Sequence, residues 1–107
     1  MADLRSLILL RNDPEEAAKL LHDAENGDMD AQYAAGLIFA EGRGVEQSDA
    51  LSYFWLTLAY EQGDEDAKLL RTIVAANITQ ANYDNAVALL DKYRSGGFHA
   101  GSAVLLQ

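Results

Sequence analysis

A short stretch of this chain recurs almost unchanged 36 residues further along. The segment Asn26–Ala31, NGDMDA, returns as Gln62–Ala67, QGDEDA. A fixed period in the mid-thirties is typical of arrays of helical hairpins, in which one unit cannot bury its own apolar face and stacks on its neighbour. The recurrence therefore predicts an all-α fold built from units of about this length.

Capping residues and glycines predict where the helices begin and end. Asp13 followed by Pro14 suits an N-cap and the first helical position, and Gly27 suits the left-handed residue that ends a helix. Either Asp28 or Asp30 caps the next helix. The same signals predict about six helices and no strand, over residues 4–11, 13–26, 28–41, 48–62, 64–76 and 79–94, the last five counted from their caps.

Length and hydropathy predict one domain without a membrane span. The 107 residues, half of them apolar, suffice for a single core, so we expect one domain over 1–107, with a repeat core at 13–94 and a tail at 95–107 that shows no clean period. The apolar run Leu7–Leu10 lacks a basic leader and indicates a buried first helix. Because no run of eighteen apolar residues occurs, a cytoplasmic location is expected.

The charge of the chain narrows the class of partner. Seventeen acidic and eight basic residues give a net charge of −9, which repels the phosphates of nucleic acids and the surface of anionic membranes. We therefore expect neither as a partner, and expect another protein, which could be basic. The chain has no cysteine, which excludes disulfides, thiolate nucleophiles and cysteine-ligated metals.

One set of residues resembles a known repeat family. It consists of Ala31, Ala35, Gly36, Phe39, Gly42, Gly44, Val45, Trp55, Ala59, Gly63 and Ala67. In this order and spacing they resemble the SEL-one-like repeat, a relative of the tetratricopeptide repeat. The resemblance implies a right-handed stack of antiparallel helical hairpins, with one intact repeat between two half-repeats and a C-terminal cap helix over 79–94. The chain departs from the family pattern at Thr72, which stands where a glycine is usual.

No group of residues predicts catalysis, a cofactor or a metal site. His22 and His99 are far apart in the sequence and no second histidine stands near either of them. No serine lies in a nucleophile elbow, and the glycines of the loop at 42–44 lack the lysine and hydroxyl residue of a phosphate loop. The acidic residues around Gly27 do not have the spacing of a calcium loop, and we interpret them as helix caps.

The expected binding surface is the concave face that the first helix of each unit would line. Tyr33 and Leu37 are four residues apart and lie on one helical face, and Leu69 and Ile73 repeat this relation 36 residues later. The predicted partner-binding residues are Tyr33, Leu37, Ala40, Glu41, Leu69, Ile73 and Ala76. The alternative is that these side chains only contact the neighbouring helices of the same chain.

These observations predict a non-catalytic adaptor or regulatory subunit that binds a partner protein through its concave face. Scaffolding functions are also what the family resemblance implies. Two alternatives are an immunity or inhibitor protein that neutralises a basic toxin or enzyme, and, with less support, a hydrolase, since some members of the family act on antibiotics. A short stack could also cover its ends by forming a homodimer, through an end helix or the tail segment Val104–Leu106.

Overall fold

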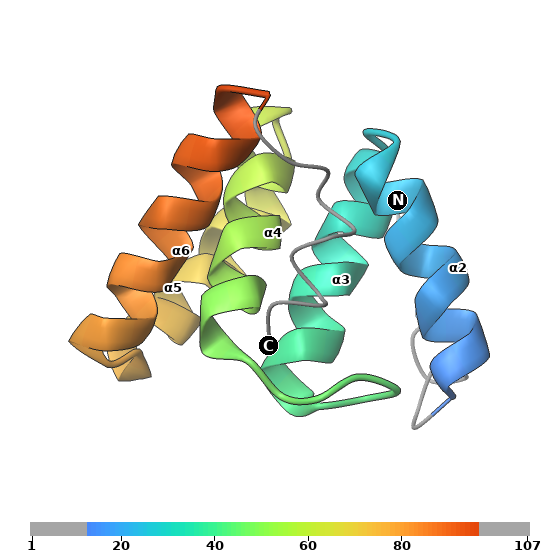
Figure 1. Ribbon diagram of the computed structural model, residues 1–107, viewed down its shortest axis with the longest axis horizontal. Helices are drawn as coiled ribbons and strands as arrows, with labels where there is room; N and C mark the ends of the chain where they lie inside the picture. The colour runs from blue at the N-terminus through green and yellow to red at the C-terminus, as the bar shows by residue number, and fades with distance from the viewer. Residues whose placement is uncertain (1–12, 97–107) are drawn as a thin grey trace.

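The computed structural model describes residues 13–96, and these form five helices and no strand (Figure 1). The predicted helix over residues 4–11 and the tail from residue 97 onward lie outside the described residues. Five of the six predicted helices are confirmed, with ends within about two residues of those expected. They are α2 (Pro14–Glu25), α3 (Met29–Glu41), α4 (Asp49–Glu61), α5 (Glu65–Asn77) and α6 (Gln80–Arg94).

Every described helix begins at a capping side chain that accepts backbone N–H groups of the first turn. Asp13 accepts from the amides of Glu15 and Glu16, at 3.1 and 3.2 Å. Asp28, rather than Asp30, caps α3 and accepts from the amide of Ala31 at 2.9 Å. The caps of the other three helices are Ser48, Asp64 and Thr79.

The recurrence in the sequence is also a recurrence in backbone geometry. Gly27 and Gly63 both adopt positive φ angles, of 97° and 106°, which few other residues tolerate. The following residues, Asp28 and Asp64, each donate their amide to the carbonyl five residues earlier, at 3.1 Å in both cases. The α2–α3 turn and the α4–α5 turn are therefore two copies of one structure, 36 residues apart.

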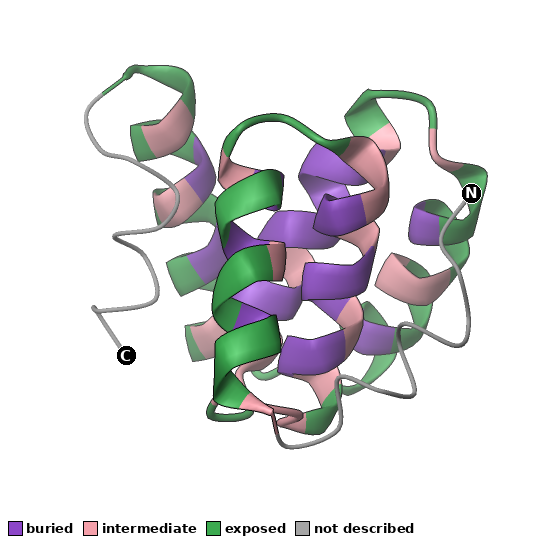
Figure 2. Ribbon diagram, turned by 90° about the vertical axis from the view of Figure 1, so that its right-hand side faces the viewer, coloured by how far each residue is buried: buried purple, intermediate pink, exposed green. Residues whose placement is uncertain are grey.

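Helix α4 is the centre of the molecule. It packs on α3, α5 and α6, while α3 also contacts α2 and α5, and consecutive helices run in opposite directions (Figure 1). Trp55 and Leu56 of α4 are fully buried, and a Cβ at Gly36 of α3 would overlap Cγ and Cδ2 of Leu56. Buried residues gather in the middle of the molecule, and the turns that join the helices are more exposed (Figure 2).

The last helix packs differently from the others. Helix α6 runs antiparallel to α5, as other consecutive helices do, but it packs mainly on α4, to which it is parallel (Figure 1). Two edge-to-face ring pairs hold it there, Tyr83 against Tyr53 at 5.6 Å and Tyr93 against Phe54 at 5.8 Å between ring centroids. Helices α5 and α6 thus approach α4 independently of each other.

Candidate functional site

The predicted binding residues on α3 are half-buried against neighbouring helices. Tyr33 and Ala40 pack on the apolar cluster that contains Leu56 of α4 and Ala67 of α5. Leu37 packs instead on the cluster that joins α2 to α3. The side chains of these three residues are therefore partly occupied by contacts within the chain, as the alternative interpretation expected. The fourth predicted binding residue on α3, Glu41, is exposed and forms an ion pair with Arg43 at 3.1 Å.

The predicted residues on α5 project into solvent. Leu69 is 67% exposed and Ile73 is 62% exposed, the highest values among the exposed large apolar side chains of the described chain. They are four residues apart on one helix, so they form a continuous apolar strip, to which the exposed Ala76 belongs. We call Leu69, Ile73 and Ala76 the α5 strip.

Tyr33 lies beside the start of α5, where its phenol has an unusual environment. Burial raises the pKa of Tyr33 above its ordinary value of 10.0, and the carboxylates of Asp66 and Asp64 raise this pKa further. The phenol is therefore neutral throughout the physiological range. We call the predicted residues of α3 together with the α5 strip the α3–α5 surface. The Tyr33 phenol can act as a hydrogen-bond donor there.

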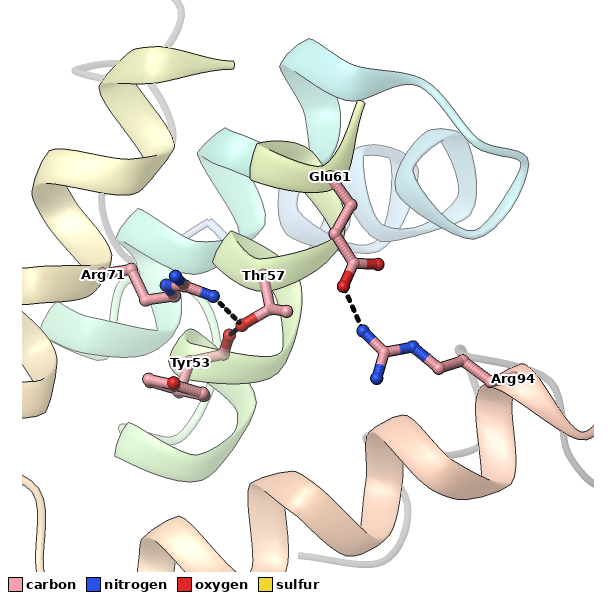
Figure 3. Close-up of polar contacts among 5 residues, drawn as sticks. All are labelled: Tyr53, Thr57, Glu61, Arg71 and Arg94. Carbon is pink, nitrogen blue, oxygen red and sulfur yellow. Dashed lines mark hydrogen bonds and ion pairs between the residues drawn. The ribbon is translucent and has the colours of Figure 1, made fainter. Parts of the chain in front are cut away.

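A second group of side chains consists of Arg71 of α5 and three residues of α4 that it contacts. The guanidinium carbon of Arg71 is 5.5 Å from the ring centroid of Tyr53 and 4.9 Å from that of Tyr60. The Nη1 of Arg71 also donates to the Thr57 hydroxyl at 3.3 Å, and Figure 3 shows this contact. We call Arg71 with Tyr53, Thr57 and Tyr60 the arginine clamp.

Helix α6 borders the same part of α4 from the other side. Arg94 of α6 forms an ion pair with Glu61 of α4, and Figure 3 shows Arg71 and Arg94 reaching α4 from different helices. Tyr83 packs edge-to-face on Tyr53, so α6 contributes to the surroundings of the arginine clamp. On the described part of α6, Tyr83 and Val87 are the large apolar side chains that remain exposed.

The sequence alone did not reveal the arginine clamp. Tyr53, Thr57 and Tyr60 follow the i, i+4, i+7 spacing of one helical face, and this spacing was an available signal. The placement of Arg71 over that face depends on how α5 crosses α4, which no local pattern contains. The cluster is thus a product of tertiary packing.

Within residues 13–96 no three acidic or histidine side chains come together in a way that could hold a metal ion. His22 contacts Asn26, one turn further along α2, at 3.2 Å. In the same part of the chain, no helix has the length and apolar character needed to cross a membrane. Comparison of the chain with protein-family models, curated proteins and solved structures finds no match.

Proposed function

We propose that this chain is a non-catalytic interaction module that binds a partner protein through the α3–α5 surface. The observation that carries the proposal is the exposure of Leu69 and Ile73, side by side on α5. Exposed apolar side chains of this kind are the usual core of a protein interface, and Tyr33 and Leu37 of α3 are only half-buried. Adaptor or regulatory roles require a surface of this kind and no catalytic group.

We further propose that the chain belongs to the SEL-one-like class of repeats, arranged as a short right-handed stack. Two observations support this. The turns at Gly27 and Gly63 have the same geometry 36 residues apart, and Gly36 allows Leu56 to pack against the backbone of α3, as the family pattern implies. In this interpretation α6 is the closing cap, since it packs along α4 and leaves one face of α5 uncovered.

A mutational test of partner binding can be made with single substitutions on exposed positions. Ile73→Asp places a charge in the α5 strip, and Ala88→Asp places the same charge on an exposed position of α6 outside both surfaces. Affinity capture from the native cell is expected to recover a protein with the wild type and with the Ala88→Asp control, but not with Ile73→Asp. Far-ultraviolet circular dichroism checks that both variants are folded. Retention of the same partners by Ile73→Asp would argue against the α3–α5 surface.

The alternative role as an inhibitor of a basic toxin or enzyme predicts a different dependence on salt. Most acidic residues of the described chain lie on α2 to α4 and their turns, where Lys19 and Arg43 are the basic residues. An interface driven by this charge would lose affinity steeply as ionic strength rises, whereas an apolar interface on the α5 strip would lose little. Titration of the captured partner at low and high salt separates the two functions.

A further inference from the structure

The arginine clamp orders the Arg71 guanidinium, and most of its N–H donors have no acceptor among residues 13–96. Arg71 is half-buried between two tyrosine rings, and the Thr57 hydroxyl that accepts from it donates in turn to the Tyr53 carbonyl at 2.8 Å. A guanidinium has five N–H groups. The contact with Thr57 uses one of them. Because stacking already orders the Arg71 side chain, little further conformational entropy of this side chain is lost when a ligand binds it.

Arg71 differs from the other arginines of the described chain in having no acidic partner there. Arg43 is paired with Glu41 and Arg94 with Glu61. No carboxylate within residues 13–96 lies within ion-pair distance of Arg71, although acidic residues outnumber basic ones by seventeen to eight in the chain. Among the arginines of residues 13–96, one without an acidic partner is therefore the exception.

A second cation lies on the same aromatic surface. The Nζ of Lys68 is 5.8 Å from the ring centroid of Tyr60, the ring that also carries Arg71. Residues 68 and 71 are three apart on α5, so both cations approach Tyr60 from one helix. Both positive charges lie close to the Tyr60 ring, and an anion bound near them would lower their mutual repulsion.

We propose that the arginine clamp, with Lys68, binds a side-chain carboxylate of an acidic segment in the partner protein. This proposal rests on the proposed function, because the ligand belongs to that partner. The planar guanidinium matches a carboxylate with two parallel hydrogen bonds, and Lys68 adds a third donor. A polyanion such as a nucleic acid is disfavoured because the chain carries a net charge of −9. The exposed ring of Tyr83, which contacts Tyr53, suits an apolar residue next to the acidic one.

A titration monitored by NMR tests the proposal without a known partner. The probe is a blocked tetrapeptide that alternates glutamate and leucine, and its control replaces both glutamates by glutamine. The acidic peptide is expected to shift the Arg71 Nε–H signal and the ring signals of Tyr53 and Tyr60 in a saturable manner. The glutamine peptide is expected to leave them unchanged. Equal shifts with both peptides, or no saturable shift with either, would overturn the proposal.

Matched variants and a second anion sharpen the test. Arg71→Gln is expected to weaken binding of the acidic peptide about tenfold or more, whereas Arg43→Gln, at an arginine that already has a partner, is expected to leave it unchanged. Arg71→Lys keeps the charge and is expected to bind more weakly than wild type, so it serves if Arg71→Gln does not fold. Inorganic phosphate at matched ionic strength that shifts the same signals at least as strongly would also overturn the carboxylate assignment.

The carboxylate site and the proposed α3–α5 interface can fail independently, and two outcomes distinguish these cases. If Ile73→Asp loses the captured partner while Arg71→Gln retains it with unchanged affinity, the α3–α5 surface stands and the arginine clamp is only a structural contact between α4 and α5. If the acidic peptide binds and Ile73→Asp retains every partner, the carboxylate site stands and the α5 strip is not the interface.

Discussion

At the scale of single residues, position 36 requires glycine because the Leu56 side chain packs directly against it. A Cβ at this position would overlap Leu56, which is fully buried in the core. Gly36→Ala is therefore expected to destabilise the fold by about 1–3 kcal/mol, since overpacking a tight contact forces rearrangement. Chemical denaturation measures this loss.

A second substitution identifies the cause of that loss. Leu56→Ala alone is expected to cost about 2–5 kcal/mol through the cavity it leaves. In the Leu56→Ala background the added methyl of Gly36→Ala fills part of this cavity, so we expect it to be neutral or stabilising. A cost of Gly36→Ala that is the same in both backgrounds would mean that contact with Leu56 is not its origin.

Tyr33 gives a prediction about pH. Its pKa is raised in the folded state by burial and by two carboxylates, so the unfolded chain loses this proton first, near pH 10.0. The contribution of Tyr33 to stability is therefore constant below that pH and is lost as the pH rises through the folded pKa. The difference in ultraviolet absorbance between wild type and Tyr33→Phe isolates the Tyr33 signal. This signal is expected to show that Tyr33 ionises at a higher pH than an ordinary tyrosine.

The carboxylates beside Tyr33 can be tested individually. Asp66→Asn removes one of the two negative charges that oppose ionisation, so the pKa of Tyr33 is expected to fall toward its ordinary value. The control Asp84→Asn changes a carboxylate on α6 and is expected to leave this titration in place. An unchanged Tyr33 titration in Asp66→Asn would mean that the Asp66 carboxylate does not contribute to the shift.

At the scale of the helices, the two repeated turns predict equivalent roles for Asp28 and Asp64. Each accepts amide hydrogens from the first turn of its helix, Asp28 at 2.9 Å from Ala31 and Asp64 at 3.1 Å from Ala67. Asp28→Ala and Asp64→Ala are both expected to cost about 1 kcal/mol of unfolding free energy, and replacement by serine, which keeps an acceptor, only a fraction of that. A large difference between the two alanine variants would show that the recurrence in geometry is not one in energy.

Local signals predicted the helices well because caps and glycines act within one turn. Asp13, Ser48 and Thr79 sit where their side chains can satisfy free amides, so each helix start is visible in the sequence. The position of α6 was not predictable in this way. Its contact with α4 depends on Tyr83 meeting Tyr53, two residues thirty positions apart, and no periodicity joins them.

In the candidate site, too, features set by local sequence were predictable and features set by tertiary contacts were not. Exposure of Leu69 and Ile73 was within reach of the sequence, because their helical face is opposite that of the buried Ala67 and Val74. The hydrogen bonds of Gln32, in contrast, were not predictable from the sequence. This buried side chain donates to the Ala24 carbonyl at 3.1 Å and accepts from Gln62 at 2.7 Å, so it joins the two repeated turns through contacts that only the folded chain creates.

At the scale of the whole molecule, packing is uneven along the chain. Nine residues of α4 are buried and three of α2 are, and among the described helices α2 packs chiefly on α3. A helix that packs chiefly on one neighbour can open alone, at lower free energy than the global transition. We therefore expect native-state hydrogen exchange to assign α2 an opening free energy at least about 1 kcal/mol below that of α4.

Val74→Ala tests whether α2 opens as a separate unit. Val74 is buried on α5 in a cluster with Leu56 and Ala59 of α4, and this cluster stays formed if α2 alone detaches. The substitution is expected to lower the exchange free energy of α4 amides by about 2 kcal/mol while that of α2 amides is unchanged, because the native state and the α2-open state lose the same contact. An equal decrease in both helices would instead mean that the described helices unfold as one cooperative unit, in which an end helix derives its stability from the entire stack.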